Sequence, residues 1–181
     1  MTGDGAASQR DGPGPTTSYH RAMTRVPSLG PRGEGWVAIQ FLLIGLAAVA
    51  GVAGSGAWTR ELRHVTTVVG ALMGAAGLFL AVRGMVDLRT ALTPFPRPLD
   101  GAPLVEHGAY ALVRHPIYAG IIVGSLGWGV VLASPLALLA SVALLVLFDL
   151  KSRREEAWLL ESQPGYAAYR RRTRKLIPGL Y

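Results

Sequence analysis

The sequence has no cysteine among its 181 residues. A disulfide framework, a thiolate metal site and a cysteine nucleophile are therefore excluded. The four histidines, His20, His64, His107 and His115, form no HxH or HxxxH pair, so we expect no metal site. A glycine-rich turn of the dinucleotide or P-loop type is also missing, so any nucleotide-like cofactor is held in another way.

Charge is missing from three long stretches. Uncharged runs cover Trp36–Trp58 (23 residues), Val65–Val82 (18 residues) and Ile117–Phe148 (32 residues). A membrane-spanning helix needs roughly 20 apolar residues, and the mean hydropathy of +0.34 is high for a soluble protein. As one helix the third run would be about 48 Å long, against a hydrocarbon core of ~30 Å. We therefore expect it to fold back at Ser134-Pro135, the one break of the right kind.

These runs predict an all-α integral membrane bundle of about four transmembrane segments. The spans are expected at about 36–58, 65–85, 116–133 and 135–150, with the last two forming a short helical hairpin. Residues 151–181 are expected to leave the membrane as a C-terminal segment that includes a cytoplasmic helix. The pairs Gly70-x-x-x-Gly74 and Gly120-x-x-x-Gly124 let helices approach closely in lipid. Room for a ligand is a second interpretation of the latter pair.

Basic residues are unevenly spread over the loops. Lys and Arg number four before the first run, two in the loop after it, four between the second and third runs, and eight after the third. The positive-inside rule then places both termini and the 83–116 loop in the cytoplasm of a multi-pass cell-membrane protein. Residues 1–35, rich in Gly, Pro, Ser and Thr, are predicted to be a disordered cytoplasmic tail. Arg83 and Asp87, one helical turn apart, are expected to form an exposed or snorkelling pair.

Polar residues gather at both ends of the third run. Because a hairpin returns the chain to the side it left, Tyr110, Arg114, His115 and Tyr118 are expected near Lys151, Glu155 and Glu156. Such a site suits a reaction between a water-soluble reagent and a lipid-embedded one. Each residue also has a structural alternative: His115 could cap a helix, Arg114 could bind a lipid phosphate, and the glutamates could be a solvated face. The basic segment 170–175 could anchor the chain on anionic lipid.

Three stretches, LVEHGAYALVRHPIYAG, EEAWL and PGYAAYRRRTRKLIPGL, resemble the integral-membrane methyltransferases related to isoprenylcysteine carboxyl methyltransferase and bacterial phospholipid methyltransferases. The likeness covers roughly Thr93 to Leu180, and RHPxYxG with EExxL at the right distance is the specific combination. The resemblance implies that residues 36–181 are a methyltransferase domain using S-adenosylmethionine. The cofactor contacts it implies are Ala102, Pro103, Leu104, Val105, Tyr110, His115, Pro116, Ile117, Tyr118 and Glu155.

The resemblance also implies an acceptor site at Lys151 and Arg114. Lys151 stands where the prenylcysteine branch has an arginine, and a lysine lacks the planar fork that grips a carboxylate. Ala102 replaces a histidine of the eukaryotic branch, and Gln163-Pro164-Gly165 replaces the usual Phe-Gly. These departures point away from prenylcysteine as the acceptor.

Methyl transfer from a sulfonium mainly requires alignment of donor and acceptor and exclusion of water. An acceptor carboxylate needs no base, whereas an amine or hydroxyl would use His115 or Glu156 as the base. We expect a membrane lipid or hydrophobic small molecule as acceptor, at the cytoplasmic membrane face, and no nucleic acid partner. The alternatives are a non-catalytic membrane scaffold of the same fold and a nicotinamide-dependent reductase-like protein, although such reductases are much longer.

Overall fold

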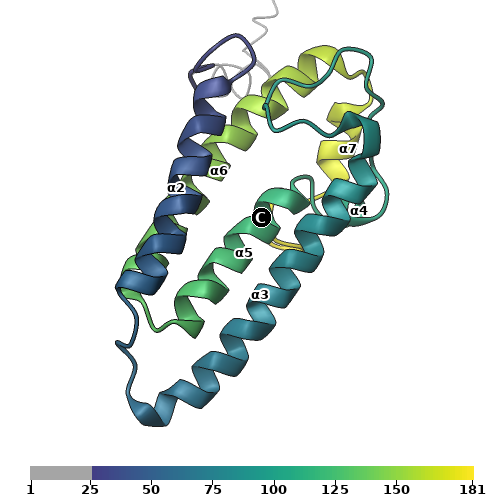
Figure 1. The fold of residues 1–181 in the computed structure, drawn as a ribbon. Helices are drawn as coiled ribbons and strands as arrows, with labels where there is room; N and C mark the ends of the chain where they lie inside the picture. The colour runs from purple at the N-terminus through teal and green to yellow at the C-terminus, as the bar shows by residue number, and fades with distance from the viewer. Residues whose placement is uncertain (1–25) are drawn as a thin grey trace, which may run out of the picture.

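The computed structural model describes residues 26–181 as a helical bundle (Figure 1). Its elements are α2 (Glu34–Ala53), α3 (Arg60–Leu88), the 3₁₀ turn η1 (Arg89–Ala91), α4 (Ala109–Leu112), α5 (Pro116–Val131), α6 (Pro135–Ser162) and α7 (Tyr166–Arg172). No strand occurs in this part of the chain. The predicted all-α membrane bundle is confirmed. Most of the predicted 1–35 tail lies outside the described residues.

Within residues 26–181, three helices are long and apolar enough to cross a membrane: α2, the continuous unit Arg60–Ala91, and α6. The fourth predicted span, α5, is apolar but has only 16 residues. That is about 24 Å at ~1.5 Å per residue, against a hydrocarbon core of ~30 Å. The bundle therefore combines three full-length helices with one short one.

The predicted hairpin break is at the expected place, since α5 ends at Val131 and α6 begins at Pro135. The hairpin's arms are unequal, because α6 has 28 residues and joins the span expected at 135–150 to the polar helical residues after it in one continuous helix. No proline or glycine interrupts residues 136–162, so nothing local stops the helix. The second arm therefore carries the polar residues after 150 on the same rigid helix as the apolar ones.

The helices form two closely packed pairs. α2 packs along α6 and α3 packs along α5, while α5 also contacts α6 and α2 (Figure 1). Within the described chain, α2 and α3 do not contact each other. The loop from 92 to 108, α4 and α7 gather at one end of the bundle. We call this end, with the last three turns of α6, the polar end.

Glycines bring α3 and α5 into backbone contact. A Cβ added at Gly77 would lie 2.5 Å from the Gly120 carbonyl oxygen and 2.5 Å from the Gly124 nitrogen, and one at Gly120 would lie 2.5 Å from the Gly77 oxygen. A Cβ at Gly127 would lie 2.6 Å from the Gly70 oxygen. The contacting glycines of each helix therefore recur every seven residues, and Gly120 serves helix packing.

We predict that Gly77→Ala destabilises the protein by about 1–3 kcal/mol, because its new methyl group must push two backbones apart. Gly74→Ala is the matched control on the same helix, since a Cβ there meets nothing within 4 Å. Replacing that helical glycine should be neutral or stabilising by up to about 1 kcal/mol. Thermal unfolding in detergent, followed by tryptophan fluorescence, measures both. Equal stabilities for the two variants would contradict the glycine contact.

Candidate functional site

A cavity of about 410 Å³ lies at the polar end, within the size range of small-molecule sites. Its walls come from α2, α3, α5 and α6, and the 91–105 segment and α7 complete it. α6 contributes Lys151, Glu155, Leu159 and Gln163. These residues recur every fourth position, so one face of α6 follows the cavity for about 18 Å.

The structure brings most of the predicted site residues together. The cavity is lined by Ala102, Pro103, Leu104, Val105, Tyr110, Arg114, His115, Ile117, Tyr118, Lys151 and Glu155. Two predicted residues do not line it. Pro116 is the first residue of α5, and Glu156 lies on a different face of α6 from Glu155.

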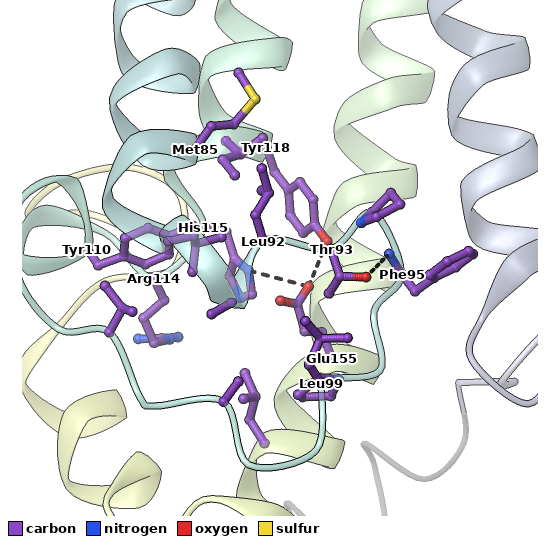
Figure 2. A pocket seen from close by; sticks show the side chains of 18 of the residues that line it. Met85, Leu92, Thr93, Phe95, Leu99, Tyr110, Arg114, His115, Tyr118 and Glu155 are labelled. Carbon is purple, nitrogen blue, oxygen red and sulfur yellow. Dashed lines mark hydrogen bonds and ion pairs between the residues drawn. The ribbon is translucent and has the colours of Figure 1, made fainter.

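Glu155 presents its carboxylate to the cavity, with its side chain 24% exposed. The Tyr118 hydroxyl donates a hydrogen bond of 2.6 Å to Glu155 Oε2, and His115 Nδ1 lies 3.9 Å from the same oxygen (Figure 2). The His115 and Tyr118 rings stack with their centroids 5.3 Å apart and their planes 3° from parallel. A carboxylate, an imidazole and a phenol are thus held in one fixed arrangement at the cavity wall.

Glu156 is buried and engaged by three cationic or hydrogen-bonding groups. Its carboxylate accepts from Arg114 Nε at 2.8 Å, lies 3.2 Å from Arg170 Nε and lies 3.2 Å from His115 Nε2. Arg114 also donates to the carbonyl oxygens of Arg170 and Thr173. This placement favours an anchoring role for Glu156 over proton abstraction.

The C-terminal chain fixes the start of α5 from the other side. The Arg114 amide donates to the Arg174 carbonyl at 2.8 Å, and the His115 amide donates to the Lys175 carbonyl at 3.1 Å. The Lys175 ammonium in turn lies 2.5 Å from the Asp149 carboxylate on α6. Part of the basic segment 170–175 therefore holds the site in place.

Lys151 is the buried charge of the cavity, with only 1% of its surface exposed. Its ammonium donates to Gln40 Oε1 at 2.5 Å and to the Pro94 carbonyl at 3.0 Å, and it lies 5.1 Å from the centroid of the Tyr118 ring. Among residues 26–181, no carboxylate lies within ion-pair distance of it. Gln40 was missed from the sequence, although an amide inside an apolar span is a usable signal.

Asp87 anchors α4, which carries Tyr110 into the cavity. Its side chain is buried, accepts from the Ala109 amide at 2.8 Å and pairs with Arg83 at 3.0 Å. Gly108 has φ of 59°, and a Cβ there would lie 2.6 Å from the Asp87 carboxyl carbon. The expected pair between Arg83 and Asp87 forms, with Arg83 51% exposed. The expectation of an exposed pair is wrong for Asp87, which is buried because it holds the start of α4.

The model of a family described as phospholipid methyltransferase matches residues 65–163, more than half of the sequence. The chain belongs to the phospholipid methyltransferase family. The predicted family is thereby confirmed. The match runs from α3 to the end of α6, and α7 lies beyond it.

One curated relative is the cobalt-zinc-cadmium resistance protein CzcN of Cupriavidus metallidurans (strain ATCC 43123 / DSM 2839 / NBRC 102507 / CH34). It is 38% identical over 79 residues, which cover 42% of this chain and 36% of the relative. The chain therefore matches little more than a third of that protein. Within residues 26–181, no group of three or more His, Cys, Asp or Glu side chains is placed to hold a metal ion.

Glu155 and Glu156 are adjacent in sequence, but their contacts predict different effects on stability when each is replaced by glutamine. Glu156→Gln should destabilise the protein by about 3–5 kcal/mol, because it removes the buried charge that pairs with the part-buried Arg114 and Arg170 guanidinium groups. Glu155→Gln should change stability by no more than about 1 kcal/mol, since an amide oxygen still accepts from Tyr118. Thermal unfolding of both variants in detergent provides the test. A larger loss for Glu155→Gln would show that the roles are reversed.

Proposed function

We propose that this protein transfers a methyl group from S-adenosylmethionine to the polar head of a lipidic or otherwise hydrophobic acceptor. The proposal depends on one observation: charged residues and exposed apolar residues of the membrane helices line the same cavity. Lys151 and Glu155 line it together with Phe41 and Met85, which are 60% and 39% exposed on their helices. Membership of the phospholipid methyltransferase family supports methyl transfer as the reaction.

The gap between α2 and α3 supports entry of the acceptor from the lipid. These helices do not contact each other, and Phe41 and Ile44 of α2 face the cavity together with Met85 and Leu88 of α3. A side chain that is exposed on a spanning helix contacts lipid. An apolar tail could therefore remain in the bilayer while its polar head reaches the cavity.

The residues present fit a nucleoside-containing methyl donor. The cavity combines apolar and aromatic walls with a few polar groups, as small-molecule sites do. One of its lining tyrosines has a buried hydroxyl without a partner among residues 26–181. S-Adenosylmethionine supplies, when bound, an electrophilic methyl group on a positively charged sulfur. We expect residues 102–105, Tyr110, His115, Ile117, Tyr118 and Glu155 to hold it, with Pro116 setting the start of α5.

We assign a role to each charged or titratable side chain that lines the cavity. The Glu155 carboxylate, fixed by Tyr118, favours binding of a cationic centre nearby. Lys151 lies one helical turn from Glu155 and has no carboxylate partner in the described chain, so it suits an anionic or hydrogen-bond-accepting acceptor head, with Arg114 on the same cavity wall. If the acceptor must lose a proton, His115 is the base that lines the cavity.

The orientation in the membrane is a further part of the proposal. Lys and Arg are concentrated in the segments that form the polar end, so the positive-inside rule places this end in the cytoplasm. Ser55, in the loop between α2 and α3, and Ser162, at the end of α6, are both exposed and lie at opposite ends of the bundle.

Because the chain has no cysteine, Ser55→Cys and Ser162→Cys each introduce a single thiol. In intact cells, a membrane-impermeant maleimide should label Cys at 55 and should label Cys at 162 only after lysis. The reverse pattern would overturn the orientation.

The function itself is tested with the full chain in lipid nanodiscs. We expect calorimetry to detect binding of S-adenosylmethionine and its demethylated product, and Glu155→Gln to weaken that binding at least tenfold. With methyl-labelled donor and a total lipid extract, label should enter the organic phase. Absence of donor binding would indicate a non-catalytic scaffold, and efficient labelling of water-soluble acceptors alone would exclude a hydrophobic acceptor.

A further inference from the structure

Four tyrosines line the cavity, and their hydroxyl groups differ in what they contact. The Tyr118 hydroxyl donates to Glu155, and the Tyr169 hydroxyl donates to the Tyr110 carbonyl at 2.7 Å. Tyr166 lines the same cavity and is 1% exposed. Its hydroxyl is buried and has no hydrogen-bond partner among residues 26–181.

The fold does not explain this hydroxyl. The Tyr166 ring packs edge-on against Tyr169, with centroids 5.8 Å apart, and belongs to an apolar cluster with Val105, Leu104 and Leu159. A phenylalanine ring would make the same contacts. Burying a hydroxyl without a partner destabilises a folded protein. Because Tyr166 also lines the cavity, its unsatisfied hydroxyl points to a partner supplied by a ligand.

The position of Tyr166 indicates which part of a ligand it meets. Its amide donates to the Gln163 carbonyl at 3.0 Å, which places it at the Gln163 end of the α6 face. Lys151, with its partner Gln40 of α2, lies at the other end of that face. The side chains packed with Tyr166 are apolar and aromatic, which suits a flat heterocycle, and Gln163 adds an amide. The nearby charges of Glu156 and Arg114 are paired with each other.

The hydroxyl is also in the right chemical state to bind a neutral polar group. Burial raises the pKa of Tyr166 well above its ordinary value, so the phenol stays protonated at physiological pH. A protonated phenol both donates and accepts a hydrogen bond. A ring nitrogen or a sugar hydroxyl satisfies it without bringing a charge into the apolar cluster.

We propose that the Tyr166 hydroxyl hydrogen-bonds the nucleoside part of the methyl donor. This inference depends on the proposed function and names a binding residue in α7, outside the range matched by the family. It assigns the Gln163 end of the cavity to the nucleoside and the Lys151 end to the acceptor head. Tyr166 is a binding residue and takes no part in breaking or forming a covalent bond.

The test is Tyr166→Phe in the full chain, with binding measured by calorimetry in nanodiscs. The demethylated donor, S-adenosylhomocysteine, should bind about three- to tenfold more weakly, as expected for the loss of one neutral hydrogen bond. 5′-Methylthioadenosine, which lacks the amino-acid part, should lose affinity by the same factor. The melting temperature of the ligand-free variant should be unchanged or higher, because an unsatisfied buried hydroxyl has been removed.

Tyr169→Phe is the matched control on the same helix. Its hydroxyl has a partner in the protein, so its removal should lower the melting temperature of the ligand-free protein. Unchanged affinity of Tyr166→Phe for S-adenosylhomocysteine would overturn the inference while leaving the proposed function intact. A loss for S-adenosylhomocysteine without a loss for 5′-methylthioadenosine would overturn the assignment to the nucleoside. Failure of the wild-type protein to bind either probe would instead count against the proposed function.

Discussion

The site depends on one buried carboxylate, that of Glu156. It joins Arg114 before α5, His115 at the α5 boundary and Arg170 on α7 to the long helix α6. These segments are distant in sequence, and none is held at the polar end by apolar packing alone. Buried charges destabilise a protein unless they are paired and hydrogen-bonded, so this cluster permits only a narrow set of positions for the chain around it. The cavity on the other face of α6 takes its shape from those positions.

Long-range patterns in the sequence predicted the fold well. The uncharged runs predicted the positions of α2, α3 and the hairpin, because a charged side chain in the hydrocarbon core of a bilayer is energetically unfavourable. The break before Pro135 was visible because a proline lacks the amide donor that a continuous helix uses. The helical character of the polar residues after Lys151 was also expected, and α6 joins them to the apolar span without a break. The partner of Lys151 was not predictable, because Gln40 lies 111 positions away.

The candidate site was only partly predictable, because parts of it depend on contacts between residues that are far apart in the sequence. A hairpin returns the chain to the side of the membrane that it left. This alone predicted that Arg114, His115 and Tyr118 lie near Glu155. Which glutamate faces the cavity was not predictable, because adjacent residues on a helix point in directions about 100° apart. The choice between them depends on how α7 and the segment before α5 pack on α6. The anchoring role of Asp87 was also not predictable, because its partner is the backbone amide of Ala109, at the start of α4. A backbone amide is present at nearly every position and leaves no pattern in a sequence.

The division of α6 into two faces has a consequence for how the protein can change over evolutionary time. The face with Lys151, Glu155, Leu159 and Gln163 lines the cavity, and Glu156 on another face holds the surrounding segments. A substitution at Lys151 or at Gln40 changes the polar groups that line the cavity without touching that anchor. The chemistry of the cavity can therefore diverge among descendants of this chain while the architecture is inherited unchanged.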